Sequence, residues 1–218
     1  MATALLQTID FKIHDRSAPD LLASGIPSFD VAFGGVPRGC VTDIFGPVSS
    51  GRTSLMFSLI AEATARKDFC ALVDASDAFD PASAAAAGVA LERLLWIRCG
   101  GNAEHALKAT DLLLQAGGFG LVVMDLGDIA PQTTRRISLA SWYRLRRAVE
   151  NTPMVLIVVE RTPLAQACAT LAVECTRGRV DWSGAPGCSR LLRGVSLTIE
   201  RRKPWRPAGA TFEARALG

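Results

Sequence analysis

Histidine is nearly absent from this sequence, which has only His14 and His105 among its 218 residues. Both are isolated from any acid–nucleophile set, so neither a Ser/His/Asp nor a Cys/His catalytic arrangement is visible. The six cysteines are scattered without a Cys-x-x-Cys pair, which argues against a metal site and favours buried free thiols in a reducing cytoplasm. No apolar run is long enough to cross a bilayer, and residues 1–12 lack the basic start and apolar core of a secretion signal. We therefore expect a cytoplasmic protein without a membrane partner.

Net charge is also small, at +3, but it is unevenly distributed. Residues 1–130 carry nine Lys and Arg against 15 Asp and Glu, whereas residues 131–218 carry 15 against six. A basic half beside an acidic half indicates that a polyanion or an acidic partner binds on one side of the molecule. The length suits one domain with a sizeable core. We expect an N-terminal arm (1–23), a core domain (24–200) and a basic C-terminal tail (201–218).

Residues 46–53, Gly-Pro-Val-Ser-Ser-Gly-Arg-Thr, match the phosphate-binding pattern Gly-x-x-x-x-Gly-Lys-[Ser/Thr] at every position except the lysine. In this pattern backbone N–H groups surround the phosphates of a nucleotide, the lysine reaches the terminal phosphates, and the hydroxyl residue binds Mg²⁺. The pattern predicts a nucleotide site with ATP and Mg²⁺ as candidate ligands. Its residues are Gly46, Pro47, Ser49, Ser50, Gly51, Arg52, Thr53 and Ser54.

Apolar strands alternate with amphipathic helices along most of the chain, which predicts an α/β fold with a mostly parallel sheet covered by helices on both faces. The predicted strands are 40–45, 69–74, 94–97, 121–125, 154–159 and 194–201, with 211–216 pairing against the last of them. The predicted helices are 53–67, 81–88, 103–115 and 138–150. Residues 177–187, rich in Gly, Pro and charge, predict a mobile loop.

Two predicted strands end in an acid, Asp74 and Asp125, at the edge of the sheet where ligands bind in such folds. Asp125 follows four apolar residues, the arrangement in which a carboxylate orients the Mg²⁺ of a phosphate-loop enzyme. Thr53 and Asp125 are therefore the candidate metal ligands, and the alternative is that Asp125 caps the next turn.

Arg52 has two functional interpretations, because arginine is a broad planar fork whereas lysine is a compact point charge. It holds phosphate oxygens in a bidentate manner, or it fills the loop and pairs with Asp125 or Asp74. On either interpretation we expect weak hydrolysis at most.

Basic side chains gather in two places that are candidates for contact with DNA or a partner. One is the helix at 138–150 and the residues before it, where three arginines share a face; the other is the segment 201–206, where a tryptophan stands among cations. The alternative for both is a solvated surface. The candidate residues are Arg136, Arg144, Arg147, Arg201, Arg202, Lys203, Trp205 and Arg206.

Residues 24–30 (Ser-Gly-Ile-Pro-Ser-Phe-Asp), 34–39 (Gly-Gly-Val-Pro-Arg-Gly) and 43–53 closely resemble the segment that leads into the phosphate loop of bacterial RecA recombinases. Residues 73–81 resemble the next strand and turn of that family, and 121–125 resemble its second acidic strand. The resemblance runs from about residue 24 to residue 159 and implies a RecA-like domain.

Three polar positions depart from the family pattern. The resemblance places Arg52 where the family has lysine, Ser76 where it has the catalytic glutamate, and Glu160 where it has a phosphate-sensing glutamine. A serine is no base at neutral pH, and an anion at Glu160 would repel phosphate. Residues 1–23 leave no room for the helix through which RecA subunits polymerise, and the separate C-terminal DNA-binding domain is missing, so we expect a monomer or small oligomer rather than a filament.

Short RecA-like chains with such changes resemble the ImuA-type proteins, which accompany a polymerase-like partner, ImuB, in damage-induced mutagenesis of bacteria. Residues 126–129, the helix at 136–149 and the arginine-rich end resemble that group. The resemblance implies a non-recombinase accessory factor in the SOS response, translesion synthesis and DNA repair, nucleoid-associated, with DNA and RecA as further candidate partners. The alternatives are an active ATPase, as a RecA paralogue that binds DNA or remodels recombinase filaments with Asp74 or Asp77 as base, and a plain DNA-binding module.

Overall fold

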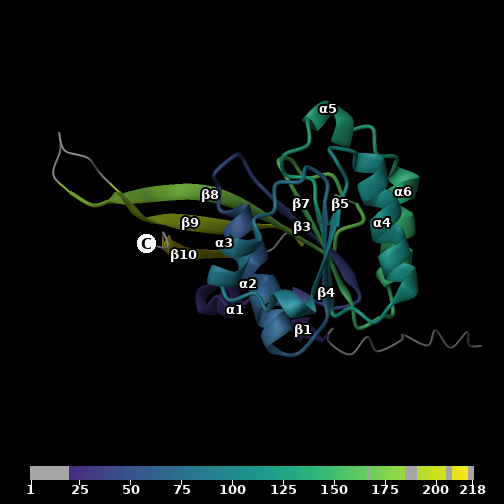
Figure 1. The fold of residues 1–218 in the computed structure, drawn as a ribbon, viewed down its shortest axis with the longest axis horizontal. Coiled ribbons are helices and arrows are strands. Elements are labelled where there is room, and N and C mark those ends of the chain that lie inside the picture. The colour runs from purple at the N-terminus through teal and green to yellow at the C-terminus, as the bar shows by residue number, and fades with distance from the viewer. Residues whose placement is uncertain (1–19, 166, 185–190, 205–207, 216–218) are drawn as a thin grey trace, which may run out of the picture.

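A computed structural model of the protein describes residues 20–165, 167–184, 191–204 and 208–215. Its centre is an eight-stranded sheet with the strand order β10-β9-β8-β3-β7-β6-β4-β5 (Figure 1). The six strands from β8 to β5 run parallel to one another, whereas β9 and β10 are antiparallel additions at one edge. The sheet strands are β3 (Cys40–Phe45), β4 (Cys70–Asp74), β5 (Leu94–Arg98), β6 (Leu121–Asp125), β7 (Val155–Glu160), β8 (Leu171–Trp182), β9 (Leu192–Lys203) and β10 (Gly209–Arg215).

Helices cover both faces of the sheet, as the sequence predicted (Figure 1). One core cluster packs α1 (Pro27–Phe33), α2 (Arg52–Ala65) and α3 (Pro81–Ala86) on one face. The other cluster packs α4 (Ala103–Ala116) and α6 (Leu139–Val149) on the opposite face, and the short α5 (Pro131–Thr134) precedes α6. The α/β fold with a mostly parallel sheet is therefore confirmed.

Local sequence accounts for where the helices begin. The Asn102 side chain accepts hydrogen bonds from two N–H groups of the first turn of α4, and Ser138 does the same once for α6. In α2 the stripe predicted from helical spacing is buried, with Leu55, Leu59 and Ile60 fully inside the core. The 3₁₀ turn η1 (Leu91–Arg93) leads into β5.

The prediction of a mobile loop at 177–187 was wrong for residues 177–182. Residues 177–182 continue β8 and pair with β9 as far as Trp182 opposite Leu192. The Gly-rich and charged composition suggested a loop, but the partner strand supplies backbone hydrogen bonds that outweigh the weak strand propensity. The two strands extend together away from the helical body (Figure 1). Residues 185–187 of that prediction lie outside the described part.

The predicted boundary between the core domain and the C-terminal tail falls within a paired strand. Residue 200 lies inside β9, and Gly209–Arg215 form β10 of the same sheet. Near the other boundary, β1 (Leu21–Leu22) pairs antiparallel with β2 (Val36–Pro37). No helix in the described ranges has the length and apolar character needed to span a membrane.

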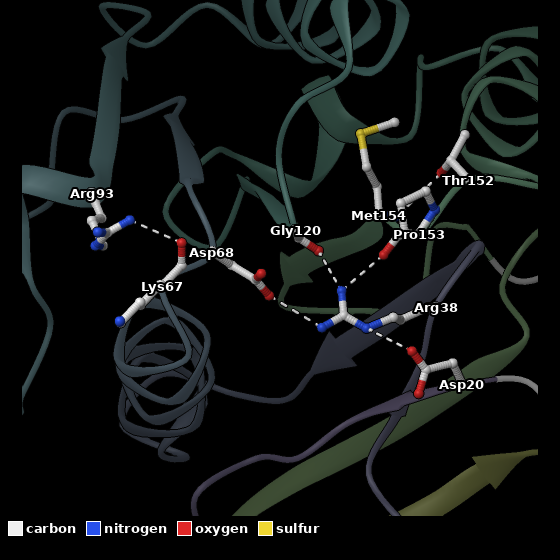
Figure 2. Close-up of polar contacts among 9 residues, drawn as sticks. All are labelled: Asp20, Arg38, Lys67, Asp68, Arg93, Gly120, Thr152, Pro153 and Met154. Atoms are coloured by element: carbon white, nitrogen blue, oxygen red, sulfur yellow. Dashed lines mark hydrogen bonds and ion pairs between the residues drawn. The ribbon is translucent and has the colours of Figure 1, made fainter.

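Arg38 contacts several segments of the chain at the end of the sheet opposite the phosphate loop (Figure 2). Its guanidinium forms ion pairs with Asp68 at 3.1 Å and with Asp20 at 3.5 Å. It also donates to the backbone carbonyls of Pro153, at 2.8 Å, and Gly120, at 3.5 Å. One largely buried side chain thus joins the starts of β3, β6 and β7, the strands whose opposite ends carry the candidate site.

Candidate nucleotide site

The predicted phosphate loop connects β3 to α2, as in the pattern from which it was inferred. The chain at Gly46 passes directly beside β8. A Cβ atom at this position would lie 2.2 Å from the carbonyl oxygen of Cys175, which no side chain can tolerate. The Gly46 N–H donates to the carbonyl of Glu160 in β7 at 3.3 Å. Both neighbouring strands therefore fix the start of the loop.

The second glycine of the loop packs against β9. A Cβ atom on Gly51 would lie 2.3 Å from a methyl carbon of Leu197, which is only 2% exposed. The hollow between the loop and the β9–β10 pair has a volume of about 210 Å³, and Val195, Leu197 and Ala214 form its far wall. This is below the roughly 300–1,000 Å³ typical of small-molecule sites.

Arg52 is turned inward, with only 8% of its surface exposed. A Cβ atom placed on Gly127, just after β6, would lie 2.8 Å from Nη1 of Arg52 and 3.0 Å from Oδ1 of Asp125. The guanidinium therefore lies beside the Asp125 carboxyl, although Nη1 has no hydrogen-bond partner in the described structure. Burial lowers the pKa of Arg52, and the nearby Asp125 opposes that shift.

Asp125 ends β6 as predicted, and its Oδ1 accepts a hydrogen bond from the Gly127 N–H at 2.8 Å. Burial raises the pKa of Asp125 to about 6. Its neighbour in register, Asp74, is engaged elsewhere, since it accepts from the N–H groups of Ala78 and Phe79 and from Trp96 Nε1. Of the two acids considered for Arg52, Asp125 is the one that faces it, whereas Asp74 caps the turn after β4.

Sequence reasoning missed a pair of carboxyls behind the loop. Asp43 in β3 is fully buried, and neither of its oxygens has a hydrogen-bond partner in the described part. Glu160 is 1% exposed, and its Oε1 accepts from the Leu164 N–H. An acidic residue inside an otherwise apolar strand was the available signal for Asp43.

Burial acts against the negative charge that was expected at Glu160. Burial, followed by the neighbouring Asp43, raises its pKa to about 9, and burial raises the pKa of Asp43 to about 7. The physical reason is that Glu160 is buried against the chain at 164–165, where water does not stabilise its charge. Burial therefore favours the neutral form of this carboxyl.

The basic segment at the end of β9 makes contacts within the fold. Arg201 donates to the Ala32 carbonyl at 3.2 Å and stacks over Phe33 at 5.1 Å. Arg202 forms ion pairs with Glu174 at 2.6 Å and with Glu200 at 3.0 Å. Lys203 donates to the carbonyl of residue 167 at 3.3 Å. Their role in DNA or partner binding stays a prediction, and Trp205 and Arg206 lie outside the described residues.

The second basic group is more accessible. Arg136, before α6, and Arg147, on α6, are exposed and make no ion pair or side-chain hydrogen bond with another described residue. Arg144 is exposed as well, but it pairs with Asp111 of α4 at 3.3 Å. The hollow that Arg136 and Arg144 line shares no residue with the hollow over the phosphate loop, so the two places are separate.

A phosphate loop between the first strand and helix of a mainly parallel sheet, with an acid at the end of a nearby strand, defines a nucleotide-binding type of α/β domain. A sequence profile of the RecA N-terminal domain matches residues 10–135. The chain belongs to the RecA family.

Relatives and a solved structure agree with this assignment. The chain is 32% identical over 185 residues to protein RecA of Rickettsia canadensis, covering 77% of this chain and 54% of that protein. It is 33% identical over 179 residues to protein RecA of Chloroflexus aurantiacus, covering 75% and 51%. The chain thus spans about half the length of the curated relatives it matches. A crystal structure of the RadB recombinase has the same fold, with a TM-score of 0.64 at 18% identity, covering 90% of this chain and 96% of that one.

Proposed function

We propose that this protein is a non-recombinase accessory factor of the RecA family that acts in translesion synthesis and the DNA-damage response. On this proposal the RecA-like fold is a platform for a polymerase-like partner of the ImuB type, and the phosphate loop serves as architecture or binds nucleotide without rapid hydrolysis. The observation that carries the proposal is the buried position of Arg52 beside Asp125.

A guanidinium in this position conflicts with Mg²⁺ at Asp125. A metal bound to this carboxylate would lie close to the guanidinium, and two cations so close repel one another strongly where water is excluded. Thr53 is exposed at the start of α2, and Asp125 ends β6. The cation that lies between the loop and this strand is the side chain of Arg52, not a metal ion. The loop backbone is suited to phosphate oxygens, whereas the metal half of the site does not fit.

The residue at position 76, where a catalytic base would be expected, supports the same proposal. Ser76 stands where the family resemblance expects a glutamate, and a serine hydroxyl does not accept a proton from water at neutral pH. The two carboxylates considered as substitutes are engaged, Asp74 in capping its turn and Asp77 in an ion pair with Arg98 at 3.1 Å. Neither of these two carboxylates is therefore free to act as the base of an active ATPase.

Calorimetric titration with Mg²⁺-ATP, together with a phosphate-release assay on the same sample, tests the nucleotide part. We expect no binding, or binding without release, and we expect Arg52→Lys alone to leave release unrestored because Ser76 still offers no base. Turnover that Asp125→Ala abolishes would instead establish the ATPase.

The partner is tested separately. We expect the protein to form a stable complex with an ImuB-type polymerase-like protein while remaining a monomer or small oligomer by light scattering. Neutralising Arg136 and Arg147 together should weaken any DNA binding at all sequences and flatten its dependence on salt. Assembly into filaments on DNA would contradict the accessory function. We also propose a cytoplasmic, nucleoid-associated location.

A further inference from the structure

A hollow beside α4 and α6 is lined by residues that follow β5 and β6, at the edge where ligands bind in parallel sheets. Its volume is about 760 Å³, within the roughly 300–1,000 Å³ of small-molecule sites and well above the space over the phosphate loop. One wall is the turn Gly100–Asn102 with the start of α4, and the other is the connection from α5 to α6.

The floor of this hollow is apolar and its rim is basic. Ala103 and Leu107 of α4 are buried, and Ile137 packs partly buried beside them. Lys108 and Arg136 line the rim and make no ion pair or side-chain hydrogen bond with another described residue. Such a pairing of apolar floor and unpaired cations suits a ligand with a flat or apolar body and an anionic group.

The other polar groups around the hollow do not cancel the positive charge of Lys108 and Arg136. Arg144 also lines the hollow, held by its ion pair with Asp111 at 3.3 Å. The hydroxyls of Ser138 and Ser141 hydrogen bond to each other at 2.9 Å. The first N–H groups of α4 are already capped by Asn102, so the helix terminus is not the binding element. A single acid in the lining, Glu104, leaves the rim with an excess of positive charge.

We propose that this hollow binds a phosphate monoester carried on an aromatic or sugar body, the chemistry of a mononucleotide, with Lys108 and Arg136 on the phosphate and Leu107 beneath the body. The proposal does not rest on the proposed function, because the phosphate loop shares no lining residue with this hollow. The same chemistry has two sources, a free mononucleotide and the 5′-phosphate at the end of a DNA strand.

Calorimetry with adenosine 5′-monophosphate on the full chain tests the site, with adenosine as the probe that lacks phosphate. We expect Lys108→Gln and Arg136→Gln each to weaken binding about tenfold, since each removes a charge-assisted hydrogen bond. Arg135→Gln is the matched control, because this arginine is adjacent and exposed but does not line the hollow. It should leave the affinity unchanged, and the phosphate-loop variant Thr53→Ala should do the same.

Competition by short single strands distinguishes the sources. Displacement of the mononucleotide by a 5′-phosphorylated strand, but not by a 5′-hydroxyl strand, would support the site with a DNA end as its ligand. Displacement by neither would support a free nucleotide. Three results would overturn the proposal: no binding of the monophosphate, equal weakening by Arg135→Gln, or equal displacement by both strands, which would mean a surface for internal phosphates.

Discussion

Glu160→Gln tests whether the buried carboxyl at the end of β7 is neutral in the folded protein. Burial and Asp43 raise its pKa from 4.5 to about 9. A carboxyl with a higher pKa in the folded state binds more protons there, so its stabilisation is full below pH 4.5 and is lost as the pH rises towards 9. The slope of about 1.4 kcal/mol per pH unit gives roughly 6 kcal/mol over this interval. We expect about 3 kcal/mol, because opening of the Leu164 contact lets water reach the carboxylate.

The assay is urea denaturation of the wild type and the variant at about pH 5, 7 and 9. The amide oxygen that Glu160→Gln introduces still accepts from the Leu164 N–H. The free energy of unfolding of the variant should therefore fall much less between about pH 5 and pH 9 than that of the wild type. Asp43, whose pKa is raised to about 7, accounts for the part that remains below that pH. Asp128→Asn, at a half-exposed carboxyl, is the control and should leave the slope intact. Equal slopes in the wild type and Glu160→Gln would refute the assignment of a neutral acid.

Other predictions concern residues that hold the sheet and the loop. Arg38→Ala should lower the free energy of unfolding by about 2–4 kcal/mol, measured by urea denaturation, because the Asp68 carboxylate loses its partner. Gly46→Ala should cost about 3 kcal/mol or prevent folding, because its Cβ would meet the Cys175 carbonyl, and a normal melting curve would contradict the geometry. Leu197→Ala should cost about 2–5 kcal/mol and widen the space over the loop. If Leu197 closes the loop, this variant binds ATP more tightly in calorimetry, and an unchanged affinity would exclude that role.

Most of the central fold was predictable because its strands are short apolar runs bounded by clear turns. β3 and β6 were predicted with their bounds unchanged, and the helix stripes matched the buried residues. The prediction weakened where residues 177–182 carry arginine and glycine yet lie in a strand. Their structure depends on pairing with β9, a contact with a later segment of the chain that local composition does not encode.

The candidate site was predictable in position but not in orientation. The motif located the loop, and the strand-end rule located Asp125 beside it. Whether Arg52 points towards solvent or inward depends on the space left by Gly127 and on the strand that covers Gly51. The raised pKa of Glu160 was not predicted for a related reason, because it depends on burial that local sequence does not reveal.

Access to the phosphate loop is decided by β8 and β9 rather than by the loop sequence. Cys175 of β8 lies against Gly46, and Leu197 of β9 lies against Gly51. Both strands lie after residue 159, outside the part of the sequence that most closely resembles RecA recombinases. A loop motif that matches at every position but one therefore does not by itself establish nucleotide binding, since the strands packed against Gly46 and Gly51 also decide how much space lies over the loop.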